Sequence, residues 1–154
     1  MNINTLFVGR VMMEFPSLDS TNTFALKYLS ETNVMEGTVI FTKRQTAGRG
    51  QRGNYWESEA DKNISMSVIL HPKFLAATRQ FDLSKIVALA VKDLIQAHCD
   101  KAVKVKWPND IYIDDRKVAG ILIQNSLSGS MVKNAVLGIG ININQEIFLS
   151  DAPN

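Results

Sequence analysis

The chain has 154 residues, 45% of them hydrophobic, which is enough for one domain with a core and short for two. Its 17 basic and 15 acidic residues leave a net charge of +2, too small by itself to indicate a nucleic-acid or membrane-surface partner. A single cysteine, Cys99, excludes an internal disulfide, and the sequence lacks a recognisable export signal or long apolar segment. These features favour a cytoplasmic protein.

The first half of the chain predicts three strands and a helix. Residues 11–15 and 38–44 have the composition of strands, the second rich in β-branched side chains. Between them, residues 20–31 begin with Ser20, a residue suited to capping a helix N-terminus. Residues 63–71 alternate apolar with small or polar side chains, as a half-buried strand does.

The second half predicts one long helix and four strands. The helix begins at Asp82 or Ser84 and ends near Cys99. Its spacing predicts one buried face made of Leu83, Ile86, Val87, Ala90, Val91, Leu94 and Ile95. The expected strands are 103–107, 110–114, 117–125 and 135–143, separated by turns at 108–109, 115–116 and 126–130. Together these elements predict an α+β fold, a mostly antiparallel mixed sheet with the helices on one face.

A basic, glycine-rich loop lies between the two halves, in the irregular stretch 45–62. Between Gly37 and Trp56 there is no acidic residue. The basic residues and glycines there are Lys43, Arg44, Arg49, Arg52, Gly48, Gly50 and Gly53. Glycines let backbone N–H groups point into one concavity, and the planar fork of arginine suits phosphate oxygens. The loop therefore predicts an anion-binding site, although a solvated surface loop has the same composition.

The segment KVKWPND at 104–110 is a second candidate. Its proline fixes the chain after a strand and presents Asn109 and Asp110 together, with Lys106 and Lys117 on either side. A lysine beside amide and carboxylate groups could hold a phosphate or a substrate carboxylate. An ordinary turn would explain the same residues.

The segment GIGININ at 138–144 is unusual because glycine weakens a strand interior. Gly138 and Gly140 share one strand face, which allows a ligand or another backbone to approach closely; a bulge is the alternative. The spacing is not that of a dinucleotide-binding fingerprint.

Taken in order, five segments resemble the motifs of biotin protein ligases. They are STN at 20–22, QTAGRGQRGNYW at 45–56, KWPND at 106–110, KVAGIL at 117–122 and GIGININ at 138–144. The resemblance runs from about Met13 to Gln145 and implies a mixed-sheet catalytic domain related to lipoate ligases and class II aminoacyl-tRNA synthetases. We expect residues 1–154 to be this domain without its C-terminal part and small C-terminal domain. No helix-turn-helix region precedes Met13, so a repressor role is not expected.

The resemblance also implies roles for individual residues. Those matching the biotin site are Ser20, Thr21, Asn22, Gln45, Gly48, Arg49, Lys117, Gly120 and Ile121. Those matching the ATP and adenylate site are Arg49, Gly50, Gln51, Arg52, Trp56, Lys106, Asn109, Asp110, Gly138, Gly140 and Asn142. The expected catalytic residues are Lys117, Arg49 and Lys106, and the expected magnesium ligand is Asp110. Gln51 stands where many family members carry an arginine, which weakens charge-assisted contact with the adenylate.

The implied reaction joins biotin to a protein. The biotin carboxylate attacks the α-phosphate of ATP, and the basic loop shields the resulting biotinyl-5′-adenylate from water. A lysine of a biotin carboxyl carrier domain, part of a biotin-dependent carboxylase, then takes the biotin. Magnesium accompanies ATP, no nucleic-acid or membrane partner is expected, and a homodimer, common in the family, stays open.

Two other functions are alternatives. The first is a lipoate ligase or an octanoyltransferase; the transferase needs a nucleophilic cysteine, and Cys99 ends an apolar helix. The second is a non-catalytic fragment that binds biotin or a nucleotide.

Overall fold

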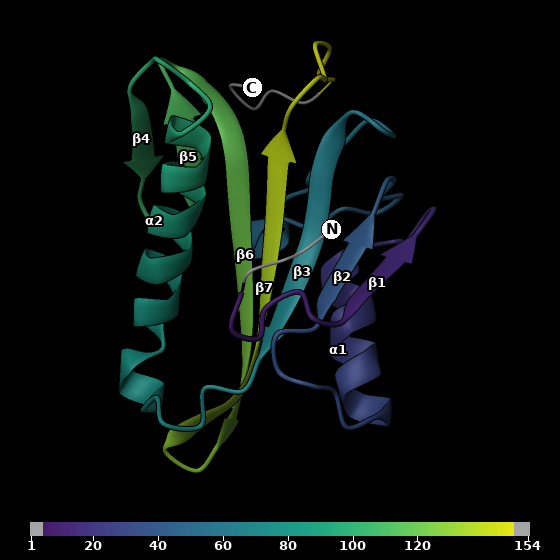
Figure 1. Cartoon of the computed structure of the whole chain (residues 1–154), viewed down its shortest axis with the longest axis vertical. Coiled ribbons are helices and arrows are strands. Elements are labelled where there is room, and N and C mark those ends of the chain that lie inside the picture. The colour runs from purple at the N-terminus through teal and green to yellow at the C-terminus, as the bar shows by residue number, and fades with distance from the viewer. Residues whose placement is uncertain (1–4, 150–154) are drawn as a thin grey trace.

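The computed structural model describes residues 5–149, which form a seven-stranded mixed sheet and two α-helices (Figure 1). The strands are β1 (Met12–Phe15), β2 (Val39–Thr42), β3 (Asn63–Leu70), β4 (Val103–Lys106), β5 (Asp110–Ile113), β6 (Arg116–Ser128) and β7 (Met131–Asn142). The helices are α1 (Thr21–Glu31) and α2 (Phe81–Gln96), with short 3-10 turns at Gln51–Gly53 and Ala77–Arg79. No helix within residues 5–149 has both the length and the apolar character needed to cross a membrane.

The strand order is β1-β2-β3-β7-β6-β5-β4, in which β1 and β2 run parallel and the other neighbouring strands run antiparallel. The prediction of a mostly antiparallel mixed sheet is therefore confirmed. Short connections join successive strands in the second half of the chain, which is why antiparallel pairing dominates there.

The two helices pack against opposite faces of the sheet, so the expectation that both cover one face is wrong. On β2, Val39 belongs to the core cluster under α2, whereas Ile40 belongs to the cluster under α1. Successive side chains of a strand point to opposite faces. Leu137 and Val136 on β7 divide in the same way. Because the central strands are apolar on both faces, both need a cover; Figure 1 shows α2 beside β4, β5 and β6, and α1 beside β1 and β2.

The buried side of α2 also differs in part from the prediction. Residues buried or half-buried as expected are Leu83, Val87, Val91 and Ile95, and Ala88 is an additional buried position. Residues expected to be buried that are exposed instead are Ile86, Ala90 and Leu94, with Ile86 at 63%. Apolar side chains occupy more than one side of this helix, so their spacing does not determine which side meets the sheet.

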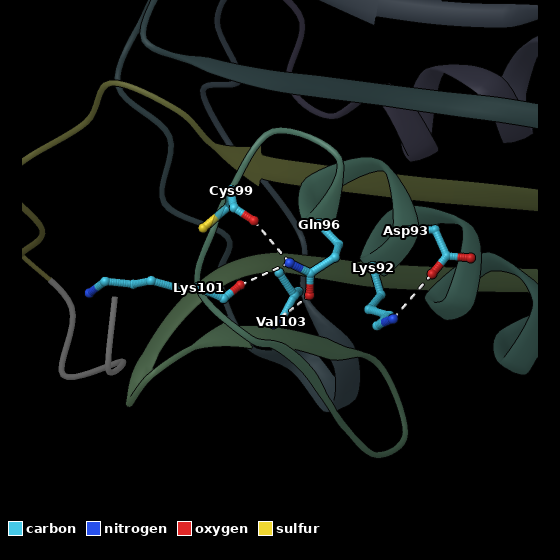
Figure 2. Close-up of polar contacts among 6 residues, drawn as sticks. All are labelled: Lys92, Asp93, Gln96, Cys99, Lys101 and Val103. Atoms are coloured by element: carbon cyan, nitrogen blue, oxygen red, sulfur yellow. Dashed lines mark hydrogen bonds and ion pairs between the residues drawn. The ribbon is translucent and has the colours of Figure 1, made fainter.

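A single glutamine side chain joins the end of α2 to β4 (Figure 2). Gln96 Nε2 donates to the carbonyl oxygens of Cys99 at 2.9 Å and Lys101 at 3.0 Å. Its Oε1 accepts from the backbone N–H of Val103 at 3.0 Å. These three bonds occupy backbone groups that the ends of the helix and strand leave without partners. The connection is thereby fixed at the point where the chain enters β4.

Two-residue turns link the last three strands. Asp114 and Asp115 connect β5 to β6, and Asp114 has a φ of 52°, which aspartate tolerates better than most residues. Gly129 and Ser130 connect β6 to β7, with Gly129 at a φ of 58°. The turn expected at 126–130 is therefore shorter than predicted, because β6 continues to pair with β7 as far as Ser128.

Candidate functional site

The first turn of α1 begins a buried polar cluster. The Ser20 hydroxyl lies 3.5 Å from the backbone nitrogen of Thr23 and caps the helix. Thr21 donates its backbone N–H to Gln45 Oε1 at 2.8 Å, and its hydroxyl lies 3.3 Å from the same oxygen. Ser20, Thr21 and Asn22 are each at most 4% exposed. Polar groups buried to this extent need partners, and the next strands supply them.

Strands β3, β6 and β7 complete the cluster. Ser67 Oγ on β3 lies 2.8 Å from Thr21 Oγ1 and 2.6 Å from Asn22 Oδ1. Asn22 Nδ2 donates to the carbonyl oxygen of Leu122 on β6 at 3.2 Å. On β7, a Cβ added to Gly138 would lie 2.3 Å from Asn22 Oδ1. Gly138 thus leaves the space into which the Asn22 side chain fits.

The basic loop folds back on itself beside this cluster. Gly50 donates its N–H to the Asn54 carbonyl at 2.7 Å, and Trp56 donates its N–H to the Gly48 carbonyl at 2.9 Å. At the tip, Arg52 has a φ of 55°, a conformation that costs energy for a non-glycine residue. Within residues 5–149, neither Arg49 nor Arg52 forms an ion pair, and both are exposed. Two guanidinium groups are therefore available to an anion.

The indole of Trp56 covers a floor made of two glycines. A Cβ added to Gly140 would lie 2.4 Å from ring atom Cε2, and one added to Gly120 would lie 2.8 Å from Cζ3. These two glycines are register partners on β7 and β6, so their bare faces adjoin. The indole Nε1 is buried and has no hydrogen-bond partner among the described residues.

Lys117 and Asp110 meet at the edge of this floor. The Lys117 ammonium lies 2.9 Å from Asp110 Oδ1, and the two side chains are 18% and 21% exposed. Among the described residues Oδ1 nevertheless has no hydrogen-bond partner, so the contact is an ion pair without the alignment of a good hydrogen bond. The same ammonium lies 5.4 Å from the centroid of the Trp56 ring, within range of a cation–π contact.

The KWPND segment reaches the site through backbone pairing with β6. The peptide bond between Trp107 and Pro108 is cis. Asn109 accepts from the Ile121 N–H at 2.9 Å, and its Nδ2 donates to the Ile121 carbonyl at 3.2 Å. The Trp107 ring packs against Phe81, with 5.3 Å between centroids.

These elements surround a cavity of about 440 Å³. The predicted site residues that line it are Ser20, Thr21, Asn22, Gln45, Arg49, Gly50, Gln51, Arg52, Trp56, Asn109, Asp110, Lys117, Gly120, Ile121, Gly138 and Gly140. The cavity thus combines a buried hydroxyl and amide cluster, a glycine floor and a basic rim. Such a site suits a ligand with a compact polar head and an anionic group.

Three predicted site residues do not line the cavity. Lys106 is exposed, and its ammonium lies 5.2 Å from the centroid of the Tyr112 ring. Asn142 donates to the carbonyl oxygen of Lys117 at 3.2 Å, so its contact is with the backbone that carries the lysine. Gly48 is buried under the loop, where a Cβ would lie 2.3 Å from the Trp56 carbonyl oxygen.

The cavity also has lining residues that the sequence reasoning missed. They include Phe81, Ser84, Met66 and Trp107. Phe81 and Ser84 lie in the first turn of α2, whose approach to the β4–β5 connection depends on tertiary packing. Their sequence signal is their place at the start of an apolar helix, which is too general to mark a site.

The described residues contain no group of three histidine, cysteine, aspartate or glutamate side chains placed to hold a metal ion. Asp110 and Asn109 offer one carboxylate and one amide, and the carboxylate already faces an ammonium. Magnesium commonly binds through one or two carboxylates together with substrate phosphates. These residues therefore fit magnesium that enters with a nucleotide better than a resident ion.

The match of this chain to a known protein family includes all of this site. The family model of the biotin/lipoate A/B protein ligases matches residues 14–142. The chain belongs to this family. Within the biotin/lipoate ligase family, it is 36% identical over 145 residues to the bifunctional ligase/repressor BirA of Bacillus spizizenii. It is 38% identical over 129 residues to the biotin–[acetyl-CoA-carboxylase] ligase of Paracoccus denitrificans.

Solved structures of biotin protein ligases have the same fold. The Aquifex aeolicus enzyme, in complex with biotin and ATP, matches with a TM-score of 0.74 and 31% identity over 92% of this chain. The Leishmania major enzyme, in complex with biotinyl-5-AMP, matches with a TM-score of 0.74 and 27% identity over 92% of this chain.

The chain spans about half the length of the relatives it matches. It covers 44% of the Bacillus protein and 51% of the Paracoccus protein. It covers 56% of the Aquifex chain and 61% of the Leishmania chain. The family match at residues 14–142 of this chain includes every residue that lines the cavity.

Proposed function

We propose that this chain is the catalytic core of a biotin protein ligase, which activates biotin with ATP and transfers it to a lysine of a biotin carboxyl carrier domain in the cytoplasm. The observation that carries the proposal is the cavity itself. A buried cluster around Thr21 and Gln45 adjoins a glycine floor, and Lys117, Arg49 and Arg52 lie at its rim. The relatives named above as ligases, and those solved with biotin, ATP or biotinyl-5-AMP, support the same reaction.

The buried cluster suits the ureido ring of biotin. A ureido group presents one carbonyl acceptor and two N–H donors, and hydroxyl and amide side chains can pair with both kinds of atom. Gln45 Oε1 is already bonded to Thr21, so Nε2 is the atom of that side chain left to donate to a ligand carbonyl. Burial makes each such bond selective, because a ligand lacking the matching atom would leave a buried group without a partner.

The first chemical step brings two anions together. A carboxylate oxygen of biotin attacks the α-phosphorus of ATP, a C–O–P linkage forms, and the bond to pyrophosphate breaks. Lys117 is half-buried close to the floor, and Arg49 and Arg52 carry free guanidinium groups on the adjoining loop. Positioned cations stabilise charge as it develops on the phosphoryl oxygens. Magnesium bound to the nucleotide would add to this neutralisation, and Asp110 is the lining residue that could offer it a carboxylate.

The second step transfers the acyl group to protein. The neutral amine of the carrier lysine attacks the carbonyl carbon of the mixed anhydride, an amide bond forms, AMP leaves, and the amine loses a proton. Before that attack the anhydride must be protected from water. The loop 48–56 lies next to the cavity, and the hydrogen bonds from Gly50, Asn54 and Trp56 join residues of the loop to one another rather than to the sheet. It is therefore the element suited to this task.

The test is a transfer assay. Purified chain, ATP, magnesium and biotin are incubated with a biotin carboxyl carrier domain, and the intact mass of the carrier is measured. Release of pyrophosphate without the carrier is followed separately, because adenylation and transfer are separate chemical steps. Lys117→Met should lose both activities, whereas Lys101→Met, at a distant surface ion pair, should retain them.

The outcomes separate the candidate functions. A gain of one biotin supports the proposal, and pyrophosphate release without transfer supports a core that adenylates biotin. A lipoyl adduct formed with lipoate in place of biotin would instead favour a lipoate ligase. Binding of biotin with neither activity would make this chain a binding module.

A further inference from the structure

The polar row on the site face of β3 contains one side chain without a partner. Asn63, Ser65 and Ser67 share this face because they are two residues apart. The Asn63 amide donates to Ser58 Oγ at 3.3 Å, and the Ser67 hydroxyl bonds to the α1 cluster. Ser65 is 3% exposed, yet its hydroxyl has no hydrogen-bond partner among residues 5–149.

Neighbouring strands do not supply the missing partner. On one side, Ser65 is the register partner of Thr42, whose hydroxyl lies 3.0 Å from the Phe15 carbonyl and 3.1 Å from the Arg44 carbonyl. On the other side it is the register partner of Gly140, which has no side chain. Because paired residues project to the same face, the Ser65 hydroxyl points to the side of the sheet on which Trp56 covers Gly140.

Two orphan donors therefore lie on the same part of the floor. A Cβ added to Gly140 would lie 2.6 Å from Trp56 Nε1, so this N–H is over the glycine next to Ser65. Tryptophan Nε1 can only donate, and it too is buried without a partner. A buried tryptophan usually finds an acceptor for this group. The two unsatisfied groups indicate that the indole covers a surface built for another occupant.

The charge at this point indicates the chemistry of that occupant. Besides the two orphan donors, the Lys117 ammonium lies 5.4 Å from the indole centroid. Within residues 5–149, the acidic group that pairs with that lysine is Asp110, at 2.9 Å. A region with three donor groups around a bare glycine favours a ligand atom that accepts hydrogen bonds and carries negative charge.

We propose that Ser65 is a further substrate-binding residue, whose hydroxyl donates to an anionic oxygen of the substrate once the Trp56 indole moves off Gly140. The inference rests on the proposed function and extends it. The oxygen belongs to the biotin carboxylate or to the nucleotide α-phosphate, which share this chemistry. Because Ser65 is buried under the present arrangement, the contact forms only in the ligand-bound state.

The proposal predicts opposite effects of Ser65→Ala on stability and on binding. In the ligand-free protein this variant should melt no lower than the wild type, because removing a buried hydroxyl without a partner is neutral or stabilising. Its affinity for the ligand should fall about tenfold, the effect of one charge-assisted hydrogen bond. The matched control is Ser67→Ala on the same strand face, which should lower the melting temperature because its hydroxyl bonds to Thr21 and Asn22.

Calorimetric titration of the whole chain with biotin, with biotinol and with ATP identifies the oxygen. Biotinol keeps the ring system and replaces the carboxylate by an alcohol. A loss of affinity for biotin but not biotinol would assign the carboxylate, and a loss for ATP would assign the phosphate; either result supports the proposal. Unchanged affinities for all three, or a fall in melting temperature equal to that of Ser67→Ala, would overturn it. Absence of biotin and ATP binding by the wild type would instead reject the proposed function, and this inference with it.

Discussion

The Lys117 ammonium lies 2.9 Å from Asp110 Oδ1, and both side chains are about four-fifths buried. Lys117 is the second residue of β6 and Asp110 is the first residue of β5, so the hairpin itself brings them together. In this state each neutralises the other. An anionic substrate must therefore compete with Asp110 for the lysine, and a cation must compete with Lys117 for the carboxylate.

Replacing Lys117 by methionine should reduce the rate of pyrophosphate release by about a hundredfold or more, because one positioned donor to a developing charge has an effect of this size.

Asp110→Asn separates the role of the Asp110 carboxylate in the ion pair from its proposed role in binding magnesium–ATP. It frees the lysine, so biotin should bind at least as tightly as in the wild type, whereas use of magnesium–ATP should weaken. Equal biotin affinity with equal ATP dependence in Asp110→Asn would show that the carboxylate serves only the ion pair.

Gly140→Ala should displace the Trp56 indole, because the added Cβ would meet three ring atoms at 2.4 to 2.6 Å. We expect a loss of about 1 to 3 kcal/mol in the free energy of unfolding, the range for overpacking a well-packed site. Combining it with Trp56→Ala should cost less than the sum of the single changes, which chemical denaturation can measure as a double-mutant cycle. Gly50→Ala is the milder comparison, since its Cβ would lie 3.2 Å from the Asn54 carbonyl oxygen, a tight contact that a small shift relieves, and its φ of −107° suits alanine.

Gln96→Ala should destabilise the fold without touching the site. The variant removes three side-chain to backbone bonds in the connection between α2 and β4. At roughly 0.5 to 1.5 kcal/mol for each bond, a loss of about 1 to 3 kcal/mol is expected after allowing for solvent access. Asp93→Ala, one turn earlier and 71% exposed in its ion pair with Lys92, should change stability little. Equal stability of the two variants in urea would contradict this role for Gln96.

The ion pair between Lys101 and Asp114, 2.6 Å long, gives a pH dependence with a defined sign. The hydrogen bond from Lys101, aided by its charge, lowers the pKa of Asp114 below 3.8, and the same contact raises the pKa of Lys101 above 10.5. The contribution of Asp114 is therefore complete above its unfolded-state pKa and lost as the pH falls through its lowered pKa. That of Lys101 is complete below its unfolded-state pKa and lost as the pH rises through its raised pKa.

Asp114→Asn tests this dependence, because asparagine accepts the positive φ at this position. The stability difference between wild type and variant in urea should be constant near neutral pH and should shrink in acid. It should be small throughout, since both side chains are mostly exposed. Asp115→Asn, at a residue with no ion pair within residues 5–149, should show no such change.

Local rules were sufficient to predict much of this fold. Ser20 caps α1 as its side chain suggests, and the alternation in 63–71 becomes β3. Both depend on residues close together in the chain. The placement of α1 and α2 on opposite faces depends on which apolar residues meet across the sheet, and adjacent apolar pairs such as Val39 and Ile40 fit either arrangement.

The candidate site likewise combines features that the sequence predicted with features that it did not. The motif resemblance predicted a set of site residues, and most of them line one cavity. It did not predict that Lys117 would pair with Asp110, that the Trp56 indole would cover Gly120 and Gly140, or that Lys106 would lie over Tyr112 outside the cavity lining. These contacts join side chains from different strands or from a loop and a strand, and their geometry depends on sheet register and on loop conformation. The roles of the individual residues stay predictions.

The alternation along β7 places two different constraints on neighbouring residues. Leu137 and Ile141 belong to the core under α2, whereas Gly138 and Gly140 face the cavity. The core positions can exchange one apolar side chain for another of similar volume. The cavity positions accept none, because any added carbon meets Asn22 or Trp56. Tolerance to substitution along this strand should therefore alternate with a period of two. The core residues can change during evolution while the glycines that face the ligand stay the same.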